Sequence, residues 1–145
     1  MELKDHAQYQ VATKVLLFHG DKILTLETPD GYMDFPGGRV NKSEIDLSWQ
    51  EALRREVDEE LGRDVSYSIG DYAFVSKRMY YQDGERHNIA AIYFTAKYTG
   101  GKITLSEEHG AYEWLTPVEI LDSERKCISS YEQTELEIFL QKHRV

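Results

Sequence analysis

The chain has 145 residues, of which 41% are hydrophobic and 30% charged, and it contains a single cysteine, Cys127. This length favours one domain over residues 1–145, and no apolar run approaches the roughly 20 residues that a membrane-spanning helix needs. The formal net charge of −9 argues against binding a nucleic-acid polymer through its phosphates. The lone cysteine and the lack of a signal-peptide pattern favour the cytoplasm.

The first part of the chain is predicted to form a β-hairpin followed by a loop. Residues 9–18 and 22–28 are β-prone, and His19-Gly20-Asp21 forms the turn between them. Residues 31–45 are rich in glycine and predict an irregular loop. A helix is then expected from residue 45 or 46 to residue 61, with Asp46 as its N-cap and Gly62 as its stop.

The remainder is predicted to alternate strands with two helices. Strand-prone stretches are residues 65–69, 71–81, 87–98, 103–105 and 111–115. Pro117 starts a short helix that runs to about Leu121, because proline is favoured at the first helical position. Residues 130–142 form a last helix with one apolar face. This order predicts an α/β or α+β domain, a layered α/β/α sandwich with a mixed, largely antiparallel sheet.

Three carboxylates stand out on the expected helix over residues 45–61. Glu56, Glu59 and Glu60 are spaced i, i+3 and i+4, which gathers them on one side of a helix, at the border between its apolar stripe and solvent. Clustered carboxylate oxygens are suitable ligands for Mg²⁺ or Mn²⁺. A solvated acidic face paired with Arg55 explains the helix alone equally well.

The turn Pro36-Gly37-Gly38 lies upstream of this helix and shifts the balance towards a ligand site. Glycines let the backbone approach a phosphate or a metal ion closely. Together with the acidic helix, this turn resembles the signature of the Nudix hydrolase family, Gly-x5-Glu-x7-Arg-Glu-U-x-Glu-Glu-x-Gly-U, where U is apolar. The positions that match by type are Gly38, Glu44, Arg55, Glu56, Val57, Glu59, Glu60 and Gly62.

Two departures from the signature are visible. Ten residues rather than seven separate Glu44 from Arg55, and Arg63 occupies the last apolar position. The insertion of three residues changes the distance between Glu44 and the helix, so the role of Glu44 is left open. The Arg-Glu-x-x-Glu-Glu core is intact.

The resemblance implies a Nudix-like fold and a metal-dependent hydrolase. Its substrate would be a small molecule, a nucleoside diphosphate linked to another group X, whose diphosphate linkage is cleaved with Mg²⁺ or Mn²⁺. Carried over by position, Glu56, Glu59, Glu60 and the backbone carbonyl of Gly37 are the metal ligands. Arg55 is the residue that orients the carboxylates. Many family members are dimers, so a homodimer is also implied, although no interface is identified.

The general base has two candidates, Glu56 and Glu108. Some Nudix hydrolases use a glutamate on a loop that faces the helix, and Glu108 has a similar spacing to the following strand. An exposed acidic loop is the alternative explanation, and His109 in the same loop needs no catalytic role.

The substrate-binding candidates are Arg39, Arg78, Tyr80 and Tyr81. Tyr80 and Tyr81 lie where dinucleoside polyphosphate hydrolases carry a tyrosine, whereas the proline typical of ADP-ribose hydrolases is missing. Strand tyrosines and surface cations are the alternatives. A non-catalytic Nudix-fold nucleotide sensor is the alternative function, since Cys127 lies in the wrong segment for a diphosphate isomerase.

Overall fold

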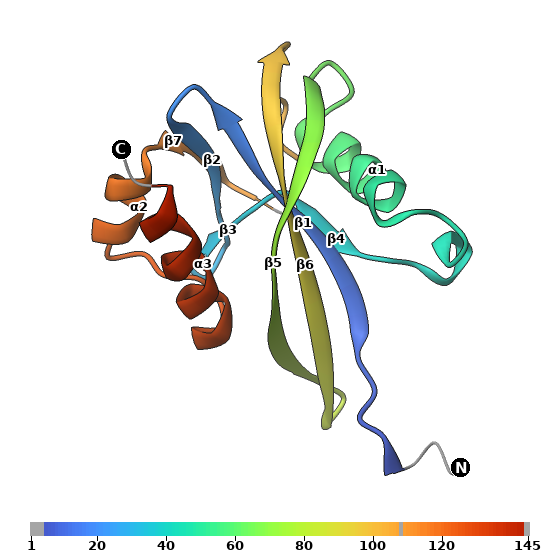
Figure 1. Ribbon diagram of the computed structural model, residues 1–145. Coiled ribbons are helices and arrows are strands. Elements are labelled where there is room, and N and C mark those ends of the chain that lie inside the picture. Colours follow the sequence, from blue (N-terminus) through green and yellow to red (C-terminus); the bar gives the residue numbers. More distant parts are fainter. Residues whose placement is uncertain (1–4, 108, 144–145) are drawn as a thin grey trace.

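The computed structural model describes residues 5–107 and 109–143 (Figure 1). Within these ranges the chain forms three α-helices, a 3₁₀ helix at Lys42–Glu44 and a seven-stranded sheet. The α-helices are α1 (Trp49–Leu61), α2 (Pro117–Asp122) and α3 (Ser130–Lys142). The strands are β1 (Gln10–His19), β2 (Lys22–Glu27), β3 (Met33–Asp34), β4 (Gly37–Arg39), β5 (Ser66–Gln82), β6 (Glu85–Gly100) and β7 (Ala111–Leu115).

The sheet is mixed and it splits along one edge of β1. Its main path runs β3-β2-β1-β6-β5, with β1 and β6 parallel and the other neighbours antiparallel. Strand β2 pairs with residues 18–19 of β1, whereas β4 pairs with residues 12–14 of the same edge. Strands β2 and β4 therefore leave the same edge of β1 in different directions (Figure 1). At this split Lys14 of β1 lies opposite Gly37 of β4 and contacts Asp34 of β3.

Two apolar cores lie on opposite faces of the sheet. Alternate residues of a strand face opposite sides, so Leu16 packs with the core below α3 while Val15 and Leu17 pack with the core below α1. Helix α1 covers one face, and α2 and α3 lie on the other (Figure 1). The predicted α/β/α sandwich is confirmed. No helix in the described residues is long and apolar enough to cross a membrane.

The prediction of an irregular loop over residues 31–45 is wrong in part. It contains β3, β4 and the 3₁₀ helix, because Gly37 and Gly38 pair with β1. Helix α1 begins later than expected, at Trp49, and its N-cap is Ser48 rather than Asp46. The hydroxyl of Ser48 accepts a hydrogen bond from the Glu51 N–H, and the Glu51 carboxylate accepts one from the Ser48 N–H, so both ends of the cap are satisfied.

Two further predictions about strands are corrected. The two strands predicted at 65–69 and 71–81 form one strand, β5, which begins at Ser66 and whose pairing with β6 shifts register around Ile69–Tyr72 instead of breaking. Residues 103–105 are not a strand. The Thr104 N–H donates to the carbonyl of Leu61 at 2.8 Å, and the Ser106 N–H donates to that of Glu60 at 2.9 Å. This segment therefore satisfies the carbonyls at the end of α1.

Candidate active site

Strand β4 approaches β1 so closely that only glycine fits at Gly37, and at Gly38 it lies against the Glu56 side chain of α1. At Gly37, where φ is 136°, a Cβ would lie 2.0 Å from the carbonyl oxygen of Thr13. At Gly38 a Cβ would lie 2.6 Å from a carboxylate oxygen of Glu56. The two glycines therefore place the backbone of β4 directly against the acidic side of α1.

Arg55 holds three carboxylates, and we call Arg55, Glu44, Glu56 and Glu59 the Arg55 cluster. Its guanidinium donates to Glu56 at 2.5 Å, to Glu59 at 2.7 Å and to Glu44 at 2.9 Å, with a second contact from Nε to Glu44. The hydrogen bonds to Glu44, and then those to Glu56 and Glu59, raise the pKa of Arg55. The cluster contains one cation and three acids, so it carries surplus negative charge.

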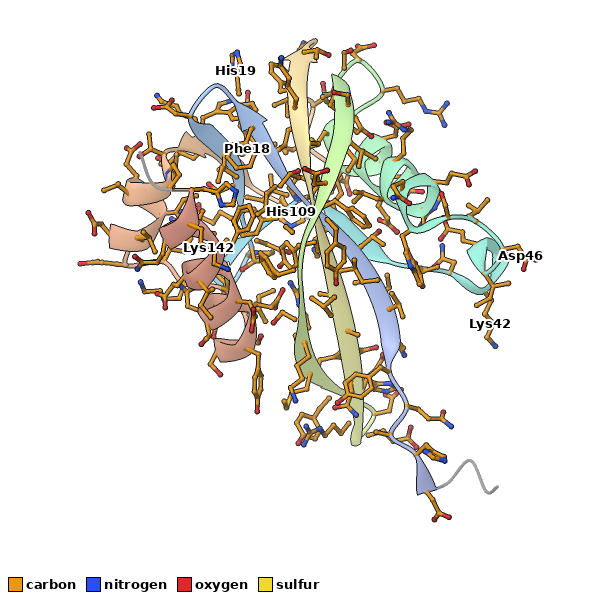
Figure 2. All side chains as sticks on the ribbon, in the orientation of Figure 1. Phe18, His19, Lys42, Asp46, His109 and Lys142 are labelled. Atoms are coloured by element: carbon orange, nitrogen blue, oxygen red, sulfur yellow. The ribbon has the colours of Figure 1, made fainter. Side chains whose placement is uncertain are left out.

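The three-residue insertion does not separate Glu44 from the helix. Ile45 is 78% exposed, and Asp46 lies with Lys42 at the outer edge of the molecule (Figure 2). Glu44 itself is buried, accepts a hydrogen bond from the Asn41 N–H at 2.8 Å and reaches Arg55. The hydrogen bond from Arg55 lowers the pKa of Glu44. The extra residues form an outward turn that returns Glu44 to α1.

The three glutamates of α1 do not share the border position predicted for them. The Glu59 side chain is 62% exposed and that of Glu56 is 15% exposed, while Glu60 is buried against β4. Burial raises the pKa of Glu56 and raises that of Glu60 to about 7, although Lys14 and His109 act in the opposite direction on Glu60. Oε2 of Glu60 has no hydrogen-bond partner among the described residues.

These side chains fit a divalent metal ion by their chemistry. Glu56, Glu59, Glu60 and the Gly37 carbonyl offer only hard oxygen atoms, which suit Mg²⁺ or Mn²⁺. In the described residues no group of three acidic, histidine or cysteine side chains is already arranged to hold a metal ion. Arg55 engages Glu56 and Glu59, while Glu60 turns inwards. The buried, unpartnered oxygen of Glu60 is the feature that a cation would satisfy.

A second charged group lies at the split of the sheet, and we call Asp34, Lys14, Arg78 and His109 the Asp34 cluster. Oδ1 of Asp34 is 3.2 Å from Lys14 Nζ and 3.3 Å from Arg78 Nη2, and Oδ2 is 3.6 Å from His109 Nε2. His109 lies near the centre of the molecule, where the strands cross (Figure 2). Burial by itself would raise the pKa of Asp34, but Lys14, His109 and Arg78 hold it well below its usual range.

Sequence reasoning missed the Asp34 cluster. Lys14 stands within the apolar run Val11–Phe18, and a lysine there must find partners when the strand is buried. It donates to Asp34 and also to the carbonyls of Phe35, at 3.2 Å, and Gly37, at 3.4 Å. The lysine in an apolar strand was a signal that a buried partner must exist, but the sequence did not show that this partner is Asp34.

Arg78 was predicted as a substrate-binding residue, with an ordinary surface cation as the alternative. Its side chain is 15% exposed, and Nη2 donates to Asp34 and, at 2.7 Å, to Glu132 of α3. Glu132 is buried and also accepts a hydrogen bond from the Tyr93 hydroxyl at 2.6 Å. Arg78 therefore joins the site to α3, and the surface-cation alternative is wrong.

The other predicted substrate-binding residues separate into two groups. The guanidinium of Arg39 lies 5.0 Å from the centre of the Tyr80 ring and contacts the Tyr80 hydroxyl. Arg39, Tyr80 and Arg78 line a cavity of about 290 Å³ together with Lys14. Tyr81 is 70% exposed, because neighbouring strand residues face opposite sides. Glu108, the second candidate base, lies outside the described residues.

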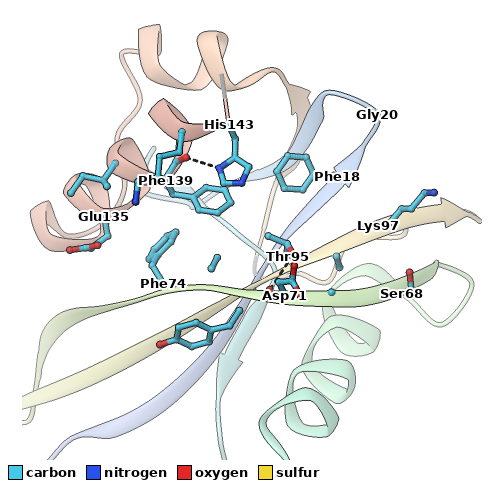
Figure 3. Close-up of a pocket in the computed structure, with 16 residues that line it drawn as sticks. Phe18, Gly20, Ser68, Asp71, Phe74, Thr95, Lys97, Glu135, Phe139 and His143 are labelled. Carbon is cyan, nitrogen blue, oxygen red and sulfur yellow. Dashed lines mark hydrogen bonds between the residues drawn. The ribbon is translucent and has the colours of Figure 1, made fainter. Parts of the chain in front are cut away.

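A wider cavity, of about 790 Å³, lies between α3 and strands β5 and β6. Phe18, Phe74, Phe139 and His143 line it, and His143 Nδ1 is 2.9 Å from the Phe139 carbonyl oxygen (Figure 3). Neither the Arg55 cluster nor the Asp34 cluster contributes to its lining. Cavity size alone therefore does not locate the candidate active site.

Comparison with known proteins identifies similar sequences and folds. A family model described as NUDIX domain matches residues 8–134. The MutT protein from Methanosarcina mazei Go1 is 28% identical, with 94% of this chain and 96% of that chain covered and a TM-score of 0.75. The E. coli ORF135 protein is 24% identical, with 94% and 92% covered and a TM-score of 0.71.

A third solved structure, a C. elegans Ap4A hydrolase, is 19% identical, with 92% and 93% covered and a TM-score of 0.65. At this identity the likeness concerns the fold. No curated protein sequence matches the chain.

Proposed function

Because the chain belongs to the Nudix hydrolase family, we propose that it cleaves the diphosphate linkage of a nucleoside diphosphate joined to another group X, using Mg²⁺ or Mn²⁺. It is an enzyme acting on phosphoric anhydride bonds, and Nudix hydrolases generally use divalent metal ions. The observation that carries the proposal is the Arg55 cluster, an acid-rich helix face placed against the glycine strand β4.

The metal ion would be held by Glu56, Glu59 and Glu60 of α1 and by the Gly37 carbonyl of β4. When bound, it neutralises charge on the diphosphate and lowers the pKa of a bound water. Arg55 orients Glu56 and Glu59 through the fixed geometry of its guanidinium. The close approach of β4 to Glu56 leaves the backbone itself as part of the wall facing the diphosphate.

Two residues remain candidates for the general base that takes the proton of the attacking water. Glu56 is half-buried, and the upward shift of its pKa brings it nearer to the range in which a base is effective at neutral pH. Glu108, which lies outside the described residues, is the alternative. Kinetic comparison of Glu56→Gln with Glu108→Gln would separate the two, since only loss of the base removes the acidic limb of the pH–rate profile.

The nucleoside part of the substrate would enter the cavity lined by Arg39 and Tyr80. Tyr80 offers a ring for stacking on a base, and Arg39 lies close enough to Gly38 to meet a phosphate. The net charge of −9 makes such local cations and the metal ion necessary for binding a polyphosphate. A relative of this fold described as an Ap4A hydrolase supports a small nucleotide derivative as substrate.

The test is a panel of nucleoside triphosphates, ADP-ribose, dinucleoside polyphosphates and nucleotide sugars, each with Mg²⁺ and with Mn²⁺. Turnover that Glu59→Gln abolishes and Asp58→Asn preserves supports the proposal. Asp58→Asn is the matched control, because it makes the same charge change on α1 away from the proposed ligands. Measurable nucleotide binding without turnover on the whole panel would favour a sensor and overturn the hydrolase proposal.

A further inference from the structure

The cavity of about 290 Å³ continues from the candidate active site, and we call it the Arg78 pocket. Gly38 lines it and also packs against Glu56, so a ligand in the pocket is adjacent to the proposed metal ligands. Three cations, Lys14, Arg39 and Arg78, line it together with the Tyr80 ring. Its volume is at the lower end of that of small-molecule sites, which suits one flat ring system.

Arg78 presents unused hydrogen-bond donors in a fixed orientation. A guanidinium has five N–H groups, and Nη2 of Arg78 donates to Glu132 at 2.7 Å and to Asp34 at 3.3 Å. Neither Nε nor Nη1 has a hydrogen-bond partner among the described residues, and Nε is fully buried. Two carboxylates thus hold the plane of the guanidinium while three N–H groups remain unpaired.

The acceptors near Arg78 are already engaged. Asp34 accepts from Lys14, from Arg78 and from the Phe35 N–H. Glu132 accepts from Arg78 and from the hydroxyls of Tyr93 and Ser129. Among the described side chains that line the pocket, we find N–H donors but no carboxylate or amide oxygen.

The Tyr80 hydroxyl does not change this balance. It contacts the Arg39 guanidinium and lies 3.4 Å from the Gln10 side-chain oxygen. A ligand edge that carries its own N–H donors would therefore face other donors inside the pocket and lose its hydrogen bonds to water. A ligand edge with a carbonyl oxygen would pair with the free N–H groups of Arg78 Nη1, the unpaired nitrogen that is not fully buried.

We propose, on the premise of the nucleotide hydrolase function above, that the Arg78 pocket selects substrates with a keto base over those with an amino base. Guanine, hypoxanthine and uracil present a carbonyl oxygen where adenine and cytosine present an amino group. Arg78 donates to this oxygen while Tyr80 packs on the ring. Each such pairing discriminates against the wrong base by about 10- to 100-fold.

The experiment compares nucleotides that differ at this one group, ITP with ATP and UTP with CTP, and the corresponding nucleotide sugars. The keto member of each pair is expected to have the higher kcat/KM, by about 10- to 100-fold. A second measurement requires neither catalysis nor a metal ion. The affinities of the metal-free protein for IMP and AMP are measured by calorimetry. The same order of affinity is expected there.

Two variants connect the preference with Arg78. Arg78→Lys keeps a cation beside Asp34 and Glu132, so the protein should fold, but it removes the planar fork of N–H groups. Its keto preference should fall to about threefold or less. Arg86→Lys makes the same change at an exposed residue near the β5–β6 turn, outside the pocket, and should leave the preference unchanged.

The outcomes separate this inference from the proposed function. Equal kcat/KM within the pairs, a preference for amino bases, or an unchanged preference in Arg78→Lys would overturn the inference while hydrolysis itself stands. Failure to hydrolyse any nucleotide would overturn the proposed function. In that event the affinities for IMP and AMP still test the inference, because tighter binding of IMP supports it and equal binding refutes it.

Discussion

The Arg55 cluster and the Asp34 cluster are built from the same kinds of side chain in opposite proportions. Arg55 is one cation among three carboxylates, and its side chain is 31% exposed. Asp34 is one carboxylate among Lys14, Arg78 and His109, and its side chain is 8% exposed. The first cluster keeps unneutralised negative charge near solvent, whereas the surplus positive charge of the second lies in the interior and is balanced through the ion pair between Arg78 and Glu132.

The two clusters therefore suggest different roles for their charges, in the fold for one and in the proposed reaction for the other. Buried charges need partners, because removing them from water is costly. Lys14 and Arg78 are balanced by Asp34 and Glu132, so their charges are paired without a ligand, although Nη1 of Arg78 has no hydrogen-bond partner among the described residues. The Arg55 cluster has one cation for three carboxylates and is therefore the group that we propose to bind further cations. We therefore expect removal of the Asp34 charge to affect mainly stability and substitutions in the Arg55 cluster to affect mainly activity.

The largest effect is expected from Asp34→Asn. It leaves the buried cations Lys14 and Arg78 without their shared carboxylate, which should lower the free energy of unfolding by about 3–5 kcal/mol. Urea unfolding followed by circular dichroism measures this change, with Asp58→Asn as the control on the surface of α1. A loss below about 1 kcal/mol would show that Asp34 is not the centre of the buried group.

The next effect concerns the pH dependence of stability in the metal-free protein. The folded-state pKa of Glu60 is about 7, against 4.5 for the ordinary carboxyl group, so the folded state binds the proton more tightly. Stability is therefore highest below pH 4.5 with respect to this group and falls by about 3 kcal/mol as the pH rises through 7.

Glu60→Gln should remove this component. The measurement is the difference in unfolding free energy between the parent protein and Glu60→Gln, with EDTA, at pH 4.5 and pH 8. A difference that does not change with pH would contradict the raised pKa of Glu60.

Glu59→Gln should reduce kcat by about 100-fold or more without a change in unfolding free energy. The Glu59 side chain is 62% exposed, so the substitution leaves no cavity. It does remove a proposed metal ligand. Loss of a partner of a metal ligand already costs about 10- to 100-fold. Near-normal turnover in the purified variant would remove Glu59 from the metal site.

Arg55→Lys should weaken metal binding by about 10- to 100-fold, since a lysine cannot hold Glu44, Glu56 and Glu59 in one plane. A Mn²⁺ titration monitored by electron paramagnetic resonance gives the dissociation constant directly. Lys97→Arg, a charge-conserving exchange remote from α1, is the control. Unchanged Mn²⁺ affinity would assign Arg55 a purely structural role.

The smallest effect separates the two neighbouring tyrosines. Tyr80→Ala should raise KM by about 10-fold, because it removes a ring that can stack on the base. Tyr81→Ala should change KM by no more than about twofold, since Tyr81 is exposed and lies outside the Arg78 pocket. The reverse order would place the base on the other face of β5.

The parts of the fold that could be predicted from sequence depend on local signals. Alternation of apolar residues and turn residues predicted the hairpin, and helical periodicity predicted α1 and α3. The start of α1 was misplaced because Asp46 and Ser48 are both good N-caps, and Glu51 decides between them through its bond to Ser48. Strand β5 was divided in two because a register shift near Gly70 looks in sequence like a turn.

In the candidate site, too, contacts between residues close in sequence could be predicted and contacts between distant residues could not. Arg55, Glu56 and Glu59 are neighbours on one helix, so their spacing predicts their contacts. The contacts of the other cluster join residues far apart in sequence, and Arg78 is 44 residues from Asp34 and 54 from Glu132. No local pattern encodes such contacts, since they exist only once the sheet has split and α3 has docked.

The outward turn after Glu44 has a consequence for how this protein can vary. The Asn41 N–H is bonded to Glu44 on one side of the turn, and Ser48 is bonded to Glu51 on the other, so both ends are anchored independently. The residues between them make backbone hydrogen bonds within the turn, but their side chains make no hydrogen bond to the Arg55 cluster. Insertions, deletions or a fused reporter peptide at Asp46 should therefore be tolerated. This position is a natural place to attach a label or to graft a binding sequence onto the enzyme.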